Sequence, residues 1–351
     1  MQRKLLWIDL EFDDINCVRC GNILEVGLIL TDNMLNEIRK LNIIVHVHQT
    51  KLTLSKWSAS VHDSSGLLLD VADSQIDIKT CETKCIEFLG DDIKDIIHCG
   101  STMSRDVQFM TYHMPTFAML LQSGYIDMST FEIIILRHNP HFWRYFPPKV
   151  QPEHRALNDA TSTVALARFL FGSLNLSIGK SHVCFRPSYR HRDVSKMLLF
   201  VNVTKSNDIV KLSMVATDIL MRQIAVHLDS TKHNRKLCYV EMDAIAFLER
   251  LKAPSYQFTM CGRNLLACRK LMEVCMPELF AKFHYRYIDL SCIDLILKVT
   301  NTILPQRKFE TIENNISTEP TQYNIITEDI NFMQAAHAGL FGISCLRNSN
   351  F

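Results

Sequence analysis

Two acidic residues interrupt an apolar run near the beginning of the sequence. Asp9 and Glu11 lie in LLWIDLE, residues 5–11, whose apolar residues predict a buried strand. Because the two acids are two positions apart, their side chains point to the same face of that strand. An Asp-x-Glu pair alone is also typical of a solvent-facing strand, so further residues must distinguish a site from a surface.

Three more residues can join this pair. Asp106 lies at the start of one predicted helix and Asp159 at the start of another, with His154 five residues before it. Helix starts that follow strands would bring these side chains to one end of a sheet. So many hard oxygen ligands are suited to two divalent cations, Mg²⁺ or Mn²⁺, because uncompensated carboxylates would repel one another. Two such ions can promote hydrolysis of a phosphodiester, with the histidine as the base for the attacking water.

Alternating strands and helices must position these residues. Apolar and β-branched runs predict strands at 4–11, 24–31, 41–47 and 95–99. Apolar residues at three- and four-residue spacing predict helices at 79–90, 105–122 and 158–171. The pattern indicates an α/β domain with a central sheet flanked by helices.

The sequence also contains an internal repeat. Residues 98–115 align with 260–277, with Cys-Gly near the start and Met-Pro at the end of both, at an offset of 162. Residues 124–136 align with 286–298 at the same offset, and both contain Tyr-Ile-Asp. The chain is therefore interpreted as a tandem duplication.

The repeat divides the chain into three parts. We expect an N-terminal copy at 1–176, a basic linker at 177–196 and a C-terminal copy at 197–351. The linker is interpreted as a solvated tether, with an electrostatic landing strip for RNA as the alternative. A chain of 351 residues is long enough for two domains with a hydrophobic core each.

Composition bears on the partners and the compartment. The 38 basic and 37 acidic residues nearly cancel, so no global field draws the chain to nucleic acid, although a local basic surface is compatible with RNA. Twelve cysteines, without a secretory segment or a membrane-length apolar run, predict reduced thiols in a cytoplasmic or nuclear protein. No presequence is expected before a strand that begins by about residue 5. Cys17 and Cys20 form a single C-x₂-C without a suitably spaced second pair, so a zinc site is not indicated.

Six segments of the N-terminal copy, taken in order, carry a resemblance to a known family. They are LLWIDLE, ILEVGLILTD, SKWSASVHDSSGL, HCGSTMSRDVQFMTYHMP, GYIDMST and EHRALNDATSTVALA. Over about residues 4–172 this copy resembles the oligoribonuclease branch of the DEDDh 3′-to-5′ exonucleases. The resemblance implies a ribonuclease-H-like fold with a mixed central sheet. It also implies a short single-stranded RNA substrate, with DNA left open.

The resemblance assigns roles to the acidic cluster. It implies that two divalent cations, Mg²⁺ or Mn²⁺, are held by Asp9, Glu11, Asp106 and Asp159. The same resemblance makes His154 the general base. Terminal bases would be sandwiched between a small hydrophobic wedge and a tryptophan, here Ile15 and Trp57.

The C-terminal copy lacks most of this set. The positions that match Asp9, Glu11, Asp106 and His154 are Asn202, Thr204, Cys268 and Asn324. The acid that remains is Asp329, which aligns with Asp159. A site that has lost three carboxylates of four is predicted to bind no pair of metal ions and to be catalytically inactive.

The C-terminal copy retains a different stretch. It has FHYRYIDLS at 283–291, where the N-terminal copy has LQSGYIDMS at 121–129. Oligoribonucleases are homodimers in which a tyrosine of this stretch reaches the partner's site. The resemblance therefore implies an intramolecular pseudo-dimer in which Tyr285 completes the N-terminal site. The alternative is that these aromatic residues only pack at the contact between the copies.

Departures from the family bear on the substrate. Family members have Thr-Gly after the first acidic pair, whereas this chain has Asp13 and Asp14, whose charges would repel phosphate. The arginine expected to cap a 5′ phosphate aligns with Gly124. The other candidate contacts for that phosphate are Thr102, Ser129 and, from the C-terminal copy, Arg286. Strict preference for 5′-phosphorylated dinucleotides is therefore not expected.

Two functions of different classes are compatible with the sequence. The first is a metal-dependent 3′-to-5′ exoribonuclease for short RNA, with an inactive C-terminal copy that supports the active site. The second is a nuclease-derived RNA-binding or adaptor protein with weak turnover or none. The intact acidic set favours the first function, and Asp13, Asp14 and the absent arginine favour the second.

Overall fold

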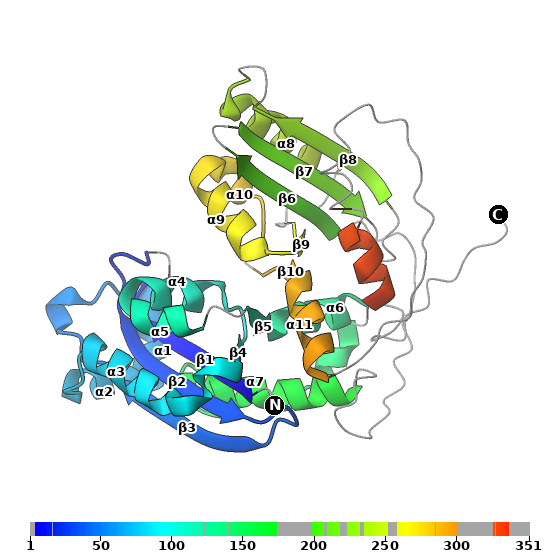
Figure 1. Ribbon diagram of the computed structural model, residues 1–351. Coiled ribbons are helices and arrows are strands. Elements are labelled where there is room, and N and C mark those ends of the chain that lie inside the picture. The colour runs from blue at the N-terminus through cyan, green and yellow to red at the C-terminus, as the bar shows by residue number, and fades with distance from the viewer. Residues whose placement is uncertain are drawn as a thin grey trace.

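The computed structural model shows two α/β units joined along one chain (Figure 1). The residues that it describes are 4–15, 17–121, 124–138, 140–173, 198–206, 209–217, 223–231, 235–251, 258–284, 286–300, 326 and 328–336. The basic linker expected at 177–196, Tyr285 and Asn324 lie outside the described residues. The sequence-based boundaries of the two copies therefore remain predictions.

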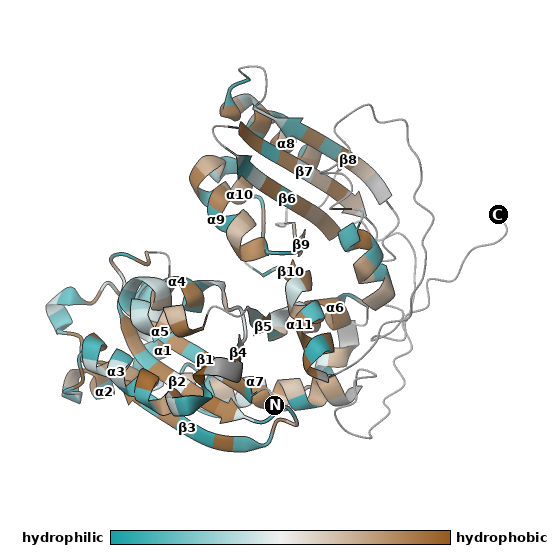
Figure 2. Cartoon of the chain, in the orientation of Figure 1, coloured by the Kyte–Doolittle hydropathy of each residue, from teal (hydrophilic) through white to brown (hydrophobic). Residues whose placement is uncertain are grey.

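The N-terminal unit contains a five-stranded sheet in the order β3-β2-β1-β4-β5. Its strands are β1 (Lys4–Phe12), β2 (Ile23–Thr31), β3 (Glu37–Ile44), β4 (Ile96–Gly100) and β5 (Tyr125–Asp127). The first three strands are antiparallel, and β4 and β5 continue the sheet in parallel with β1, so the sheet is mixed. Strand β1 lies at the centre, and β2 is buried along its whole length. The outer strand β3 instead alternates between hydrophilic and hydrophobic residues, as Figure 2 shows.

Helices cover this sheet. They are α1 (Lys56–Ser64), α2 (Leu67–Asp73), α3 (Ile78–Leu89), α4 (Ser104–His113), α5 (Pro115–Leu120), α6 (Met128–His138) and α7 (Ala156–Ser173), with 3₁₀ turns η1 (Gln49–Lys51), η2 (Gly90–Asp95) and η3 (Pro140–Tyr145). The single helix predicted at 105–122 is wrong, because the chain leaves the helical conformation at Met114, directly before Pro115. The strand predicted at 41–47 begins earlier and ends earlier, at 37–44, because it pairs with β2 through an exposed, polar first half.

The C-terminal unit repeats the arrangement. Its sheet has the order β10-β9-β6-β7-β8. The strands are β6 (Leu198–Ser206), β7 (Ile209–Thr217), β8 (Gln223–Ser230), β9 (Met260–Gly262) and β10 (Ile288–Asp289). The helices are α8 (Leu237–Arg250), α9 (Leu265–Cys275), α10 (Pro277–Phe280) and α11 (Leu290–Thr300), and residues 328–336 are also helical.

The repeat extends to single hydrogen bonds. In the N-terminal unit Glu82 accepts from the backbone nitrogens of Thr116 and Phe117, at 2.7 and 3.0 Å. In the C-terminal unit Glu241 accepts from the backbone nitrogens at 278 and 279, at 2.8 and 3.0 Å. These acceptors stand at the starts of α5 and α10, whose first N–H groups have no partner within the helix. The internal repeat found in the sequence is therefore present in the structure.

Each unit has its own apolar cluster, and a third cluster joins them. This third cluster includes Trp7, Phe131 and Phe171 of the N-terminal unit and Phe200 and Ile293 of the C-terminal unit. The two units thus share buried apolar surface, which stabilises their contact at about 25 cal/mol per Å².

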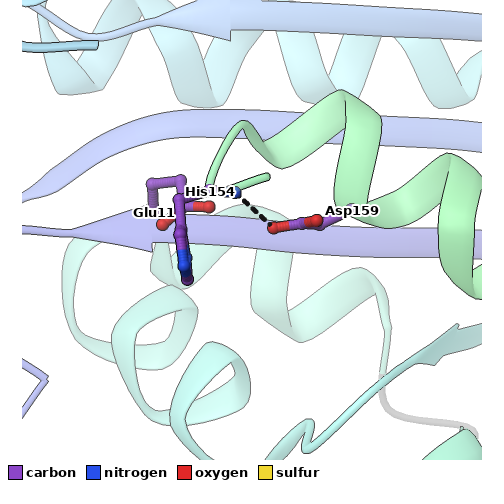
Figure 3. Close-up of side chains that lie close together, drawn as sticks. All are labelled: Glu11, His154 and Asp159. Atoms are coloured by element: carbon purple, nitrogen blue, oxygen red, sulfur yellow. Dashed lines mark hydrogen bonds between the residues drawn. The ribbon is translucent and has the colours of Figure 1, made fainter. Parts of the chain in front are cut away.

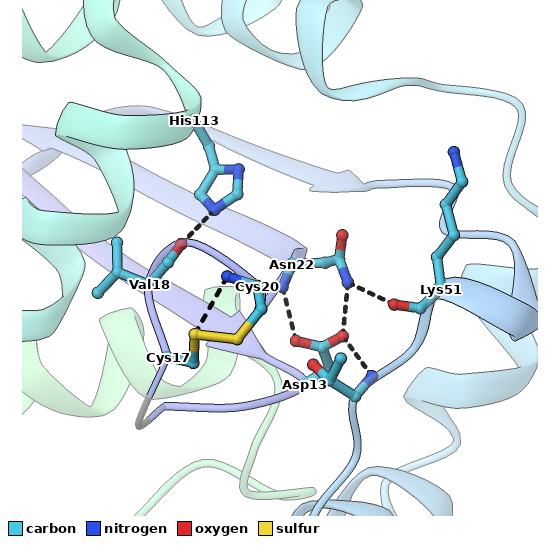
Figure 4. The surroundings of a disulfide bond; sticks show 8 residues. Asp13, Cys17, Val18, Cys20, Asn22, Lys51 and His113 are labelled. Atoms are coloured by element: carbon cyan, nitrogen blue, oxygen red, sulfur yellow. Dashed lines mark hydrogen bonds between the residues drawn. A yellow bond between two sulfur atoms is a disulfide. The ribbon is translucent and has the colours of Figure 1, made fainter.

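One cysteine pair differs from the expectation of reduced thiols. Cys17 and Cys20 form a disulfide in the β1–β2 loop, with their Cα atoms 5.4 Å apart (Figure 4). The prediction was wrong for this pair, because composition and compartment say nothing of a tight turn that brings two neighbouring thiols together. The eight other cysteines that the structure describes are free.

Candidate active site

The two acids of β1 lie on one face of the central strand, as their spacing predicts. Asp9 is opposite Gly27 on β2 and Glu11 is opposite Glu25. Asp9 is half-buried and Glu11 is buried. The strand is central and paired on both sides, and the burial of Glu11 does not fit the alternative of a solvent-facing strand.

Helix α7 begins directly against this face. A Cβ atom on Gly27 would lie only 2.4 Å from the carbonyl carbon of Ala156, so only glycine allows the helix to approach so closely. This approach brings the first turn of α7, which carries Asp159, beside Asp9 and Glu11. Gly27 is therefore a structural part of the site.

An ion pair beneath the site fixes the same helix start. Glu25 is fully buried, and one of its oxygens accepts from the backbone nitrogen of Ala156 at 2.9 Å. Arg155 donates to both Glu25 oxygens through Nε, at 3.1 and 3.2 Å, and also pairs with Asp70 at 2.9 Å. Glu25 and Arg155 thus hold the residue next to His154. The sequence analysis missed this pair, although an acid inside the apolar strand 23–31 was a usable signal.

Three side chains of the candidate site lie close together. One ligand atom each of Glu11, His154 and Asp159 lie within 4.8 Å of one another. Figure 3 shows the three side chains converging from β1 and from the start of α7. Asp159 accepts a hydrogen bond from the backbone nitrogen of His154 at 3.0 Å. This bond stabilises the backbone at His154, whose φ of 59° is in the left-handed region.

Asp106 and Asp9 complete the acidic cluster. Asp106 is buried in the first turn of α4 and accepts from the backbone nitrogen of Leu10 at 3.2 Å. Burial raises the pKa of Asp106 to about 7. Burial, followed by the charges of Glu11 and Asp106, raises the pKa of Asp9 well above its usual value.

The pKa values of Glu11 and Asp159 are raised as well. Burial, then the charge of Asp159, raises the pKa of Glu11, and burial raises the pKa of Asp159. Four carboxylates whose pKa values are raised mainly by burial fit a site built for cations. The donor set is made of hard oxygens, so the residues present fit divalent ions of the Mg²⁺ and Mn²⁺ type.

Trp57 lies beside the candidate base. Its ring meets that of His154 edge to face, with the centroids 5.5 Å apart, and 61% of Trp57 is exposed. Ile15, in the β1–β2 loop, is also exposed, at 44%. Both residues predicted to sandwich bases are therefore accessible, and the tryptophan borders the acidic cluster. An exposed aromatic face offers stacking worth about 1–3 kcal/mol per base.

His62, on α1, is a further neighbour of the cluster. It is buried, and its Nε2 lies 2.8 Å from the carbonyl oxygen of Phe12. Its Nδ1 lies 3.9 Å from a Glu11 oxygen. His62 is thus bonded to β1 at the Phe12 carbonyl and lies close to Glu11 without a hydrogen bond to it.

Asp13 does not extend toward solvent, contrary to the expectation that it repels phosphate. It is buried, and its oxygens accept from the Asn22 backbone and side chain at 2.6 Å and from the Thr53 backbone at 2.9 Å (Figure 4). The expectation was wrong for this residue, because backbone and amide donors surround the carboxylate. Asp13 instead links the loop that carries Ile15 to the segment that leads to Trp57.

The expected phosphate contacts lie around Asp127. Asp127 accepts from the backbone nitrogens of Thr102 and Ser129, at 2.8 and 2.9 Å. Thr102 is half-buried, whereas Ser129 is only 1% exposed, so a phosphate could not reach its hydroxyl in this arrangement. Arg286 pairs across the units with Glu132, at 3.4 Å, and Tyr285 lies outside the described residues.

Comparisons with known proteins give the family. A sequence model described as exonuclease matches residues 6–167. An oligoribonuclease of Idiomarina loihiensis is 31% identical over 169 residues, which cover 47% of this chain and 90% of that protein. A probable oligoribonuclease of Dictyostelium discoideum is 32% identical over 167 residues, or 46% of this chain and 85% of that protein. The chain belongs to the oligoribonuclease family, through its N-terminal half.

Solved structures of lower similarity also match. A cell-death related nuclease has a TM-score of 0.39 and 17% identity, covering 48% of this chain and 64% of that chain. The zinc-bound complex of E. coli exonuclease I with single-stranded DNA has a TM-score of 0.42 and 10% identity, covering 88% of this chain and 75% of that chain. The family assignment rests on the sequence relatives and not on these likenesses. Within the described part of the chain, no helix is both long and apolar enough to span a bilayer.

Proposed function

We propose that this protein is a 3′-to-5′ exoribonuclease that hydrolyses short single-stranded RNA at a single site in its N-terminal copy. The observation that carries the proposal is the convergence of Glu11, His154 and Asp159 within 4.8 Å. Asp9 and Asp106 extend the cluster, since the charges of Glu11, Asp106 and Asp159 raise the pKa of Asp9 and the charge of Asp106 also raises the pKa of Glu11. An RNA substrate is favoured because the curated relatives are named oligoribonucleases.

Each residue has a role in this reaction. Asp9, Glu11, Asp106 and Asp159 would hold the divalent cations, which when bound supply Lewis-acid activation of water and stabilisation of the leaving oxygen. His154 takes the proton of the attacking water through its ring. Its backbone is fixed by the hydrogen bond to Asp159, and its ring is bordered by Trp57. Stacking on Trp57 therefore brings a terminal nucleotide next to the base.

The C-terminal copy is proposed to be inactive. Asn202, Thr204 and Cys268 replace three of the carboxylates. The remaining acid, Asp329, is bound by Arg263, whose Nη1 donates to its Oδ1 at 2.9 Å. A guanidinium that neutralises the last carboxylate supports an arrangement without metal ions.

We further propose that the two copies pair as an intramolecular pseudo-dimer. Tyr125 and Tyr287, which are equivalent in the repeat, have hydroxyl oxygens 3.1 Å apart. The contacts around them are reciprocal. The backbone nitrogen of Asp127 donates to the Cys292 sulfur at 3.3 Å, and that of Asp289 donates to the Thr130 hydroxyl at 3.1 Å.

This reciprocity is the pattern of a two-fold interface. Asp127 and Asp289 are equivalent in the repeat, and so are Thr130 and Cys292. In a two-fold interface, residue i contacts j while the symmetry-related j contacts i. The reciprocal hydrogen bonds support the pairing, and the role of Tyr285 in the N-terminal site remains a prediction from the family resemblance.

A time course of trimming tests the function. RNAs of two, five and twenty nucleotides, labelled at the 5′ end, would be incubated with Mg²⁺ or Mn²⁺ and either the wild type or Asp9→Ala. We expect stepwise shortening from the 3′ end that is abolished in the variant. Asn202→Ala, at the equivalent position of the C-terminal copy, is the control and should trim at the wild-type rate.

The alternative function is binding without turnover. If the wild type trims none of the RNAs, and RNA still quenches the fluorescence of Trp57, the protein is an RNA-binding or adaptor protein with a nuclease fold. The same length series reports whether dinucleotides are preferred in the absence of an arginine at Gly124.

A further inference from the structure

A pocket opens in the N-terminal unit on the side of α4 and α5. It has a volume of about 340 Å³ and is lined by His98, Val107, Met110, Thr111, Pro115, Ala118, Met119, Leu121, Gly124 and Tyr125. Thr111 and Met119 are exposed at its mouth, whereas Leu121 and His98 are buried. The volume is within the range of small-molecule sites, about 300–1,000 Å³.

One lining residue, His98, has a ring nitrogen without a hydrogen-bond partner in the described part of the chain. It is only 5% exposed, and its Nδ1 is buried with no hydrogen-bond partner among the described residues. Burial lowers the pKa of His98 to about 4, so its ring is neutral near pH 7. A neutral imidazole in the pocket wall offers a ligand one nitrogen that donates and one that accepts a hydrogen bond.

The C-terminal unit shows what the equivalent space accommodates. At the position of Val107 it has Arg269, which donates to the His284 carbonyl at 3.0 Å. The guanidinium carbon of Arg269 lies 4.9 Å from the centre of the Phe280 ring and 5.1 Å from that of Tyr287. A flat, nitrogen-bearing group therefore occupies this place between two aromatic rings.

The N-terminal unit has lost the groups that fill this space. Ala118 stands where the C-terminal unit has Phe280, Val107 where it has Arg269, and Gly124 where it has Arg286. Both units have a tyrosine at this place. Tyr125 is equivalent to Tyr287, and its hydroxyl is held by hydrogen bonds to Tyr287 and Asp289, at 3.1 and 3.2 Å.

The lining also indicates the charge of the ligand. Among the ten lining residues no carboxylate is found, so a buried cation such as guanidinium would lack a counterion. The rings of His98 and Tyr125 are tilted by 34°, with their centroids 5.8 Å apart, and Met110, Pro115 and Leu121 add apolar surface. These features suit a neutral flat ring that carries hydrogen-bonding nitrogens.

We propose that this pocket is a second nucleobase site, in which the base of a nucleoside stacks on Tyr125 and hydrogen-bonds to the imidazole of His98. The site is separate from the acidic cluster and does not depend on catalysis there. Its ligand is a free nucleoside or nucleotide, the class of compound that RNA degradation releases. Stacking on one aromatic ring and one buried hydrogen bond predict weak binding that responds to the nucleoside concentration.

Saturation-transfer NMR with the full chain tests the site, with adenosine, guanosine, cytidine and uridine as probes. The buffer contains EDTA, so that metal-assisted binding at the acidic cluster does not contribute. The variant Ala118→Phe restores the side chain of the C-terminal unit and fills the pocket, and His98→Met introduces the residue found at 260. We expect the affinity to fall about tenfold or more in Ala118→Phe and several-fold in His98→Met.

Trp57→Ala separates this site from the catalytic one. The proposal requires that nucleoside binding persists in Trp57→Ala and is lost in Ala118→Phe, while both variants melt within a few degrees of the wild type. Binding that disappears in Trp57→Ala and is unchanged in both pocket variants would overturn it. Failure of all four nucleosides to bind the wild type would overturn it as well. If Ala118→Phe does not fold, His98→Met decides, because unchanged affinity in that variant contradicts the proposal.

Discussion

At the scale of single residues, ionisation of the carboxylates in the candidate site is unfavourable. The four carboxylates on β1, α4 and α7 have raised pKa values because they are buried together. Bound divalent cations would remove this cost. The protein without metal should therefore be less stable near neutral pH than in mild acid, which is the reverse of the usual behaviour of paired carboxylates.

Asp106 allows a direct test of this charge effect. Its folded-state pKa of about 7 is above the ordinary value of 3.8, so its contribution to stability is present below pH 4 and is lost as the pH rises to about 7. Asp106→Asn should raise the metal-free unfolding free energy at pH 7.5 by on the order of 1–3 kcal/mol, and it should flatten the pH profile between 4 and 7. Urea unfolding in EDTA measures both. A variant that is less stable than the wild type at pH 7.5 would contradict the account.

Glu25 is the residue expected to position His154. Glu25→Gln keeps the shape but removes the charge that holds Arg155, so we expect a loss of about 1–3 kcal/mol in stability and a 10- to 100-fold fall in kcat. Glu37→Gln is the matched control, since Glu37 forms an exposed pair with Lys40 at 3.6 Å and should change stability by less than about 0.5 kcal/mol. Equal effects of the two substitutions would refute the positioning role.

At the scale of elements, the β1–β2 loop carries Ile15 and the start of α1 carries Trp57, the two residues expected to sandwich terminal bases. Asp13 connects them through its bonds to Asn22 and Thr53. Cys17 and Cys20 close the loop, and His113 of α4 lies 2.9 Å from the Val18 carbonyl. The loop that carries Ile15 is thus tied to two neighbouring elements.

Loss of Asp13 should therefore affect substrate binding more than chemistry. We expect Asp13→Ala to raise KM for a pentanucleotide about tenfold, with kcat changed by less than about threefold, because the acidic cluster is untouched. Asp14→Ala is the comparison, and by the charge argument it should leave KM unchanged or lower it. Steady-state kinetics decides, and a KM in Asp13→Ala equal to that of the wild type would show that the link is unimportant.

The elements also show how much of the fold could be predicted from the sequence. The strands around Asp9 and the helix that begins before Asp159 were predictable, because their apolar periodicity is strong and local. The break at Met114 was missed although Pro115 marks it. The contact of Asp13 with Thr53 and the identity of the partner of Glu25 could not be predicted, because these contacts join residues 40 and 130 positions apart, and a single sequence does not reveal such pairs.

At the scale of the whole molecule, one chain contains two units that repeat one strand order and differ in the acids at the matching positions. The contacts at Tyr125 and Tyr287 are reciprocal, whereas the acids that could bind cations are concentrated in the N-terminal unit. The repeat was readable from its constant offset. The replacement of three acids in the C-terminal copy was also readable from the sequence, and the inactivity of that copy stays a prediction. The filled and open versions of the same pocket, at Arg269 and Val107, emerged only from the packing.

The central claim is that catalysis belongs to the N-terminal copy alone, and a matched pair of substitutions tests it. Asp159 and Asp329 occupy equivalent positions at the starts of equivalent helices. Trimming of a pentanucleotide with Mn²⁺ would be measured for Asp159→Asn and Asp329→Asn at equal folded concentrations. The account predicts a loss of at least about 100-fold for Asp159→Asn and a rate within about twofold of the wild type for Asp329→Asn. Equal losses in both variants, or full activity in Asp159→Asn, would contradict it.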